Sequence, residues 1–305
     1  MKPSEIFLEL VELGGVPHGY EDAVYQDLLS QQGFTYVKGN YHKPGTLPIV
    51  LTAHLDTVHD SPGPHPFLVE DNFVHTNGLS ILGADDKAGV ALILYLAHKL
   101  PVHFVLFYGE EYGLLGSKSM ASDIQRQPNA LNKALVMLSL DRQGTTDVVW
   151  HQLGAPTANH EVAAWLARAL SKNGDYQFQP AEGIFTDSYA FQNLIPNCMN
   201  LSVGYYNAHS TRELQNLTYL DWLGERLLDL NWEALVQQAK QYEDGPLSLY
   251  RTDWDEILFT DRWAAINDLH AYLSCDSHAL YDFLCDLKDL QIQEVELLMD
   301  AYLNH

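Results

Sequence analysis

The sequence predicts an α/β fold: a three-layer sandwich around a mixed, mostly parallel central sheet, with a small helical extension at its C-terminal end. Three observations support this fold class. Short apolar runs typical of buried strands alternate with helical stretches over residues 1–242. Several of these runs end in a histidine or a carboxylate. Strand, loop and helix in regular succession favour parallel strands with helices packed against the sheet.

Both kinds of element alternate in the first half of the chain. The predicted helices span residues 6–13, 20–32, 90–100 and 114–122. The predicted strands span residues 34–38, 49–53, 67–70, 73–76 and 103–108. Glycines end the first two helices, and Asp71-Asn72 separates the two strands of a predicted hairpin.

The same alternation continues in the second half. The predicted strands span residues 134–140, 148–151, 176–179 and 199–204, and 148–151 is expected to be an edge strand. The predicted helices span residues 160–170, 187–193 and 219–242. No internal repeat or low-complexity tract interrupts this order, so residues 1–242 are predicted to form one domain.

The character of the chain changes at Glu243-Asp244-Gly245-Pro246. Residues 243–305 contain 14 Asp or Glu and three Arg or Lys, with apolar stripes at helical spacing. These stripes predict an acidic helical extension that packs on the main domain. A surface that binds a partner is the alternative interpretation.

The overall composition limits the classes of function. The formal charge is −23 and 47% of the residues are apolar, so the chain can bury a full core but lacks the basic surface that nucleic acid and anionic membranes require. The N-terminus resembles no signal peptide, and the longest apolar stretch, 89–97, is too short to span a bilayer. Three cysteines without metal-type spacing suit a reducing compartment. We therefore expect a cytoplasmic protein with no nucleic-acid or membrane partner.

One apolar run, Pro48 to Asp56, ends in two residues that can work together. His54 and Asp56 are two apart, so their side chains share a face if the strand continues through them. A carboxylate that accepts a proton from one imidazole nitrogen orients the ring and leaves the other nitrogen free for a metal. On its own this pair is weak evidence, because a histidine at a strand end is often only hydrogen-bonded to a neighbour.

Further polar residues follow the predicted strands in order, or lie one loop beyond them. The set comprises His54, Asp56, Asp85, Asp86, Glu110, Glu111, Asp141 and His209. Each member has an ordinary explanation, such as a helix N-terminus, a solvated loop or a turn. In an open α/β sheet, however, ligands bind outside the carboxyl ends of the strands. Imidazoles and carboxylates gathered there predict a metal site suited to zinc, with cobalt or manganese as alternatives.

The charge of the candidate ligands favours two metal ions over one. Asp85, Glu111 and Asp141 carry three negative charges, which one divalent ion leaves net negative and two bring to about +1. Paired ions lower the pKa of water and stabilise an oxyanion. Glu110, beside the candidate ligand Glu111, is the expected general base.

The motifs together resemble those of the co-catalytic dizinc exopeptidases, the M20, M28 and M42 peptidases. The matching segments are Ala53-His54-Leu55-Asp56, Gly83 to Gly89, Gly109-Glu110-Glu111 with Gly116-Ser117, Asp141 and His209. The 83–89 segment is most similar to peptidase T-like M20 members. The resemblance covers about residues 5–240 and implies that residues 1–242 are a dizinc peptidase catalytic domain.

The resemblance also implies a role for each residue. His54, Asp85 and Asp141 would bind one zinc ion. Asp85, Glu111 and His209 would bind the other, with Asp85 bridging the two. Glu110 would act as general base and acid, and Asp56 would orient His54. A cis peptide bond between Asp85 and Asp86 is implied as well.

In one respect the chain departs from the M20 pattern. Those enzymes insert a lid and dimerisation domain before the final histidine, whereas Asp141 to His209 leaves room only for short elements. The architecture therefore resembles M28, and an oligomer formed through such a lid is not expected. Tyr205 and Tyr206 lie near the site in sequence, but neither aligns with the tyrosine that M28 enzymes often use as an oxyanion donor.

Two residues are candidates for substrate binding. Asp187, in a segment that resembles a substrate-pocket loop of these families, could hold an ammonium group, or Thr186 or Asp187 could instead cap a helix. Arg212 could bind a carboxylate, although pairing with surface acids is the more common use of such a residue.

We interpret the sequence as that of a dizinc metallopeptidase that hydrolyses terminal bonds of short peptides or amino acid amides. An aminopeptidase is favoured because no lid is present. A carboxypeptidase or an N-acyl amino acid deacylase with the same metals is one alternative. A non-catalytic binding protein on a peptidase scaffold is another.

Overall fold

The computed structural model describes residues 1–127, 129–172, 175–243 and 245. A nine-stranded sheet forms its centre, with the strand order β1-β2-β6-β3-β7-β11-β8-β10 and β9 paired to β8. The strands are β1 (Thr35–Val37), β2 (Asn40–Lys43), β3 (Ile49–His54), β6 (His103–Phe107), β7 (Val136–Arg142), β8 (Asp147–Gln152), β9 (Ala155–Pro156), β10 (Gln179–Gly183) and β11 (Cys198–Ser202).

The centre of this sheet is parallel. Strands β6, β3, β7 and β11 run in the same direction, and β10 is parallel to β8. Strand β2 is antiparallel to both of its neighbours, β1 and β6, and β8 is antiparallel to β11. The mixed, mostly parallel sheet predicted from the sequence is confirmed, and the carboxyl ends of its four central strands share one edge.

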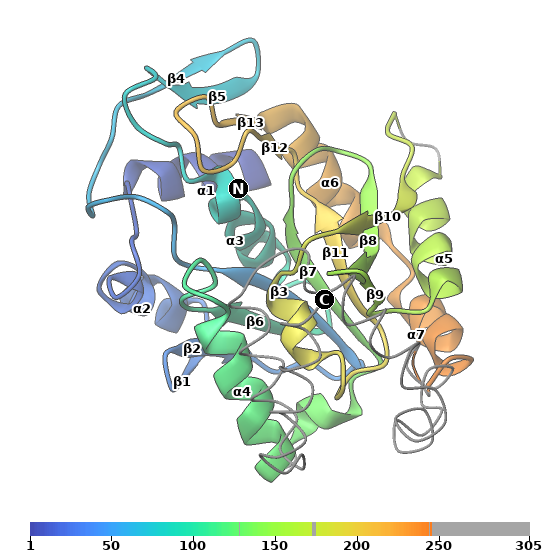
Figure 1. Ribbon diagram of the computed structural model, residues 1–305. Coiled ribbons are helices and arrows are strands. Elements are labelled where there is room, and N and C mark those ends of the chain that lie inside the picture. The colour runs from blue at the N-terminus through green and yellow to red at the C-terminus, as the bar shows by residue number, and fades with distance from the viewer. Residues whose placement is uncertain (128, 173–174, 244, 246–305) are drawn as a thin grey trace, which may run out of the picture. The chain divides into compact units, whose positions relative to one another are not determined.

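Helices cover both faces of the sheet (Figure 1). One face packs against α1 (Pro3–Glu12), α2 (Glu21–Gln31), α3 (Ala84–Leu96), α5 (His160–Ser171), α6 (Leu217–Asp229) and α7 (Trp232–Lys240). The other packs against α4 (Leu115–Arg126) and the 3₁₀ turns η1 (Ala130–Lys133) and η2 (Asp187–Phe191). Alternation along β3 explains the two cores: Ile49 and Leu51 lie in the first, and Val50 lies in the second.

The helix α3 lies very close to the sheet because of a glycine. A Cβ atom at Gly89 would lie 2.1 Å from the carbonyl oxygen of Leu140 in β7, so no other residue fits without a shift. The second glycine of the 83–89 motif therefore lets the start of α3 approach the end of β7.

A second, four-stranded sheet has the order β12-β13-β5-β4. It contains β4 (Phe67–Glu70), β5 (Phe73–Thr76), β12 (Tyr205–Tyr206) and β13 (Leu214–Asn216). The predicted hairpin is β4–β5, joined at Asp71 and Asn72, both of which adopt positive φ. The connection between β12 and β13 carries His209, so this small sheet presents a candidate ligand to the main sheet.

Several predicted elements differ from the structure. The single helix predicted over 219–242 is two helices, because Leu230 is extended and the side chain of Asn231 caps a new helix at Ala234 N. The strand expected at the edge, β8, lies inside the sheet, because β10 pairs beyond it. That outer strand spans Gln179–Gly183 rather than 176–179, and the short strand β2 was not predicted.

The predicted extension 243–305 lies almost entirely outside the described residues, so its helical character, its packing and the boundary at 242 stay predictions. Among the described residues, Cys198 is a free, buried cysteine. Within that same part of the chain, no helix is both long and apolar enough to cross a membrane.

Candidate metal centre

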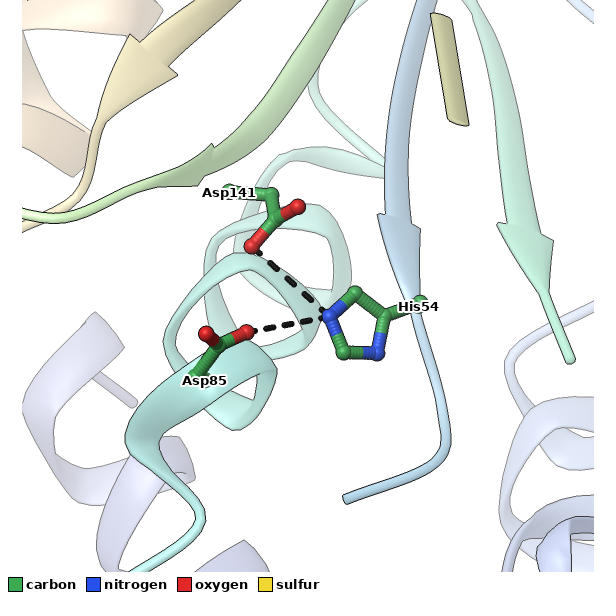
Figure 2. A group of neighbouring side chains, drawn as sticks. All are labelled: His54, Asp85 and Asp141. Atoms are coloured by element: carbon green, nitrogen blue, oxygen red, sulfur yellow. Dashed lines mark hydrogen bonds and ion pairs between the residues drawn. The ribbon is translucent and has the colours of Figure 1, made fainter. Parts of the chain in front are cut away.

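Three of the predicted ligands meet at the carboxyl ends of β3 and β7 (Figure 2). His54 is the last residue of β3, Asp141 lies near the end of β7, and Asp85 lies at the start of α3. His54 Nε2 lies 3.0 Å from Asp85 Oδ1 and 3.7 Å from Asp141 Oδ1. The three side chains converge on a common point, as ligands of one ion would.

A second group shares Asp85 with the first. His209 Nε2 lies 2.8 Å from Glu111 Oε1 and 3.3 Å from Asp85 Oδ2. One carboxylate oxygen of Asp85 thus faces His54 and the other faces His209. In each group the candidate ligand atoms lie within 4.8 Å of one another. The predicted bridging position of Asp85 agrees with this geometry, and the peptide bond between Asp85 and Asp86 is cis, as the resemblance implies.

Carboxylates surround both histidines and change their pKa values. Burial alone would lower the pKa of His54, but Asp141 and the other carboxylates around it raise that pKa well above its ordinary value. Contacts with Asp85 and Glu111 raise the pKa of His209 to about 10. Without a metal ion, these imidazoles would hold a proton in the position where a ligand lone pair is needed.

The carboxylates respond in opposite directions. Burial favours the neutral form of Asp85, yet His209 and His54 bring its pKa below the usual range. Burial and the charge of Asp85 raise the pKa of Asp141 to about 6. A cluster of buried acids with this much mutual repulsion is costly unless cations neutralise it.

One contact is a specific test of whether these residues suit a metal ion. Glu111 Oε1 is buried and lies 2.8 Å from His209 Nε2, yet it has no hydrogen-bond partner among the described residues. Two atoms that are close but poorly aligned for a hydrogen bond are arranged as ligands of one cation are. Imidazole nitrogen and carboxylate oxygen are also the donors that zinc accepts. The residues therefore fit a divalent ion.

Asp56 contacts more than the ring it was predicted to orient. His54 Nδ1 lies 2.9 Å from the backbone carbonyl oxygen of Asp56 and 3.5 Å from its carboxylate. That carboxylate accepts the backbone N–H groups of Glu110 and Glu111, at 3.0 and 3.1 Å. The nearest acceptor for the ring is thus the main chain of Asp56, and the side chain fixes the loop that carries the candidate base.

Glu110 lies beside the first group of ligands. One of its oxygens, together with an atom each of His54 and Glu111, belongs to a set within 4.8 Å. Burial raises the pKa of Glu110 well above its ordinary value, and nearby carboxylates add to the effect. A carboxylate with a raised pKa holds a proton more readily than an exposed one, which suits a group that must take up a proton during a reaction.

Three residues hold Asp141 through contacts that the sequence interpretation did not predict, although it placed Tyr205 near the site. The hydroxyl of Thr186 donates to Asp141 Oδ2 at 2.7 Å, and the hydroxyl of Tyr205 lies 3.1 Å from Asp141 Oδ1. The side chain of Asn200, on the neighbouring strand, pairs with the backbone of Asp141 in both directions. Thr186 was considered only as a helix cap, and its side chain caps nothing.

Two more residues around Asp85 make contacts that the sequence did not predict; Asp86 was among the candidate polar residues, and Glu213 was not. The buried carboxylate of Asp86 accepts the backbone N–H groups of His54 and Gly89. The buried carboxylate of Glu213 accepts three backbone N–H groups in the segment that leads to Asp85. Burial raises the pKa of Glu213 to about 7. The only sequence signal for Glu213 is its place four residues after His209, which a surface acid could equally occupy.

The two candidate substrate-binding residues lie in different environments. Asp187 is 1% exposed, burial raises its pKa to about 8, and its Oδ1 has no hydrogen-bond partner within the described chain. Arg212 is exposed, and its guanidinium makes no ion pair with any described residue, so the predicted pairing with surface acids is absent there. Neither environment tests the substrate roles.

Comparison with known proteins agrees with this site. The family model described as Peptidase family M28 matches residues 36–224, more than half of the chain. The chain belongs to peptidase family M28. The family confirms the expected zinc exopeptidase superfamily, the M28-like architecture and the class of peptide hydrolase. The closer motif similarity to M20 members remains a prediction.

Solved structures share the fold at low identity. Aminopeptidase PepT from Bacillus cereus has a TM-score of 0.59 and 17% identity, over 78% of this chain and 98% of that one. The TET1 peptidase of Pyrococcus horikoshii has a TM-score of 0.59 and 16% identity, over 74% and 98%. The LapA aminopeptidase of Legionella pneumophila has a TM-score of 0.51 and 13% identity, over 77% and 70%. Likeness at this level of identity establishes the fold alone.

A curated relative matches over a short segment. The uncharacterized protein YqjE of Bacillus subtilis is 40% identical over 80 residues, which are 24% of this chain. The matched segment spans about a fifth of that relative's length.

Proposed function

We propose that this chain is an exopeptidase that binds two divalent metal ions and hydrolyses the terminal bond of short peptides. Zinc is the proposed metal, and cobalt and manganese are the alternatives. The observation that carries the proposal is the pair of ligand groups that share Asp85, one containing His54 and Asp141 and the other Glu111 and His209. Three carboxylates between two imidazoles provide the charge that two divalent ions neutralise. Such ions, when bound, supply Lewis-acid chemistry that acidifies water and stabilises negative charge on an attacked carbonyl.

Glu110 moves the proton in this proposal. Its carboxylate accepts a proton from the attacking water, and the resulting carboxylic acid then donates it to the nitrogen of the leaving amine. Burial supports the second step because it raises the pKa of Glu110 well above its ordinary value and so favours the protonated form that donates to the leaving amine. The Asp56 carboxylate contributes by holding the main chain of Glu110 and Glu111 in place.

Access to the site supports action on a peptide end. The imidazole of His209 is 49% exposed, whereas that of His54 is 1% exposed. A substrate would therefore approach from the His209 side of the cluster. Because PepT and LapA are named aminopeptidases, we propose an aminopeptidase, in which the buried carboxylate of Asp187 would stabilise the substrate ammonium.

One observation favours a second candidate function. Arg212 lies three residues from His209, is exposed, and has no ion-pair partner in the described part of the chain. A guanidinium there suits a substrate carboxylate. That arrangement would serve a carboxypeptidase or an N-acyl amino acid deacylase built on the same metal ligands.

A panel of substrates with metal analysis tests the proposal. The purified protein, loaded with zinc, cobalt or manganese, would be assayed on amino acid amides, free tripeptides, N-blocked dipeptides and N-acyl amino acids. Cleavage of amides and free peptides is expected, with none after chelation of the metals. Cleavage of N-acyl substrates alone would favour the second candidate. Two bound ions without any hydrolysis would indicate a binding protein and overturn both.

The compartment is part of the proposal. Cys198 is free and buried, which is compatible with a reducing environment, and we propose the cytoplasm. The binding partner that we propose is the substrate, a short peptide or an amino acid amide. TET1 of Pyrococcus horikoshii can assemble into a tetrahedron or an octahedral shell, and we propose no such assembly for this chain.

A further inference from the structure

The carboxylate of Glu213 is buried against the segment that positions Asp85. Its Oε2 accepts the backbone N–H groups of Leu82 at 2.9 Å and Gly83 at 2.7 Å. Its Oε1 accepts the N–H of Asp85 itself at 3.0 Å. The side chain is 1% exposed, so water does not substitute for these contacts. Three donors from one short segment thus converge on a single carboxylate.

The segment that these contacts hold has no regular secondary structure of its own to fix it. Residues 77–83 form a loop, and Gly83 adopts positive φ immediately before α3. Asp85 and Asp86 have non-helical backbone angles although they lie inside the bounds of that helix. The orientation of the Asp85 carboxylate therefore depends on contacts from outside the loop, and Glu213 supplies three of them.

Glu213 also links this loop to the second group of candidate ligands, which contains His209. It lies four residues after His209, at the end of the turn between β12 and β13. Hydrogen bonds within the turn keep it compact: Ser210 Oγ donates to the carbonyl oxygen of Asn207, and Glu213 N donates to the carbonyl oxygen of Ser210. One short turn thus carries two relevant side chains. The imidazole of His209 is a candidate metal ligand, and the carboxylate of Glu213 holds the main chain of Asp85, the candidate bridging ligand.

We infer that Glu213 is a positioning residue for the metal centre: its carboxylate sets the distance between Asp85 and His209 and so the affinity for the ions. The inference rests on the proposed two-metal site. Glu213 contacts neither substrate nor metal, and it acts through the backbone N–H of Asp85. Contacts of this kind behind metal ligands typically change metal affinity by about 10–100-fold.

A purely structural role is the competing explanation. Lys87 is buried nearby and donates to the carbonyl oxygen of Gly14, so the region also connects the loop to the end of α1. If Glu213 only stabilised this packing, its loss would lower the melting temperature of the metal-free protein. The affinity of the folded molecules for metal would then be unchanged.

The substitution Glu213→Gln separates the two explanations. An amide has one acceptor oxygen, so its NH₂ group must point at the N–H of Asp85 or at those of Leu82 and Gly83, donor against donor. The matched control is Glu12→Gln, the same change at an exposed residue at the end of α1. Three quantities would be measured in the full-length protein: zinc affinity by competition with a chelator, the visible absorption spectrum of the cobalt-loaded form, and thermal unfolding without metal.

We expect Glu213→Gln to weaken zinc binding about 10–100-fold and to alter the cobalt spectrum at temperatures where the metal-free variant is folded. Glu12→Gln should match the unmodified protein in all three measurements. Unchanged affinity and spectrum in Glu213→Gln would overturn the inference and leave the two-metal proposal standing. If the unmodified protein itself binds no ions, the proposed function fails, and the inference fails with it.

A second variant decides the matter if Glu213→Gln does not fold. Glu213→Asp keeps both oxygens and the charge but is one methylene shorter, so it cannot reach all three N–H groups at once. We expect Glu213→Asp to fold and to bind zinc more weakly than the unmodified protein. Affinity equal to that of the unmodified protein would again overturn the inference.

Discussion

Two pairs of histidines in this molecule show how neighbours decide what an imidazole does. His54 and His209 face carboxylates at the carboxyl ends of the central strands. His42 in β2 and His103 in β6 face each other instead, with Nε2 and Nδ1 3.4 Å apart and the rings stacked. Burial, assisted by His103, lowers the pKa of His42 to about 4, and burial also lowers the pKa of His103.

Burial alone does not distinguish the two pairs. His54 is 1% exposed and His103 is 5% exposed, yet their pKa values move in opposite directions. The difference comes from the acids around His54, which favour a positive charge at that place. A buried histidine without acids packs as a neutral ring, whereas one among acids lies where a positive charge, from its own proton or from a cation, is favoured. The predictions below test this contrast, from the largest expected effect to the smallest.

The largest contrast is between His54→Gln and His42→Gln. Removal of His54 takes an imidazole from a group of three candidate ligands, so we expect loss of bound metal and of activity to background. His42→Gln changes a ring that contacts no candidate ligand and should leave both unchanged. Metal content by atomic emission and peptide hydrolysis measure the two effects. Full activity in His54→Gln would contradict the site.

Glu110→Gln should have the next largest effect. The amide cannot accept the proton from water, so we expect kcat to fall about 10²–10⁴-fold. Both metal ions should remain bound, since Glu110 is not assigned as a ligand of either. Activity equal to that of the unmodified protein, with metals bound, would remove Glu110 from the mechanism.

Thr186→Val should act through Asp141 with a smaller effect. It removes the hydroxyl that donates to Asp141 Oδ2 at 2.7 Å and keeps the shape of the side chain. We expect metal affinity to fall about tenfold, in the lower part of the range for contacts behind a ligand. Thr46→Val is the control, because Thr46 is exposed and precedes the start of β3, whereas His54 lies at the other end of that strand. Competition with a chelator measures both, and equal affinities would show that this hydrogen bond is dispensable.

The smallest effect concerns stability and pH. Since the pKa of His42 is about 4 when folded and near 6.5 when unfolded, the unfolded chain takes up the proton first as pH falls. The contribution of neutral His42 is therefore fully present above pH 6.5 and is lost as pH falls toward 4. We expect His42→Gln to lessen the decline in the free energy of unfolding over this range.

Chemical denaturation at pH 7.5, 5.5 and 4.5 measures that decline. The control is His160→Gln, because His160 is half exposed at the start of α5. A decline in His42→Gln that matches both the control and the unmodified protein would show that His42 does not contribute.

The sequence predicts that the candidate metal ligands lie close together, because they follow apolar strands, and the structure brings them within 4.8 Å of one another in each group. His54 and Asp141 come at the ends of apolar runs typical of buried strands, and parallel strands bring such ends together. The 83–89 segment is similarly constrained, since Gly89 must let α3 approach β7. Here the local pattern and the tertiary position are determined by the same residues.

The supporting residues could not be predicted in the same way. Glu213 and Thr186 contact residues that are 128 and 45 positions away in sequence, through hydrogen bonds that leave no periodic pattern. The outer position of β10 and the break between α6 and α7 likewise depend on tertiary packing and on one capping asparagine. Such features depend on which distant segments of the chain the tertiary fold brings into contact.

The central claim is that two cations share Asp85, and anomalous diffraction tests it most directly. Crystals of the zinc-loaded protein would be measured above and below the zinc absorption edge. We expect two anomalous peaks per chain, one among His54, Asp85 and Asp141 and one among Asp85, Glu111 and His209. A single peak, or peaks that do not both contact Asp85, would contradict the account.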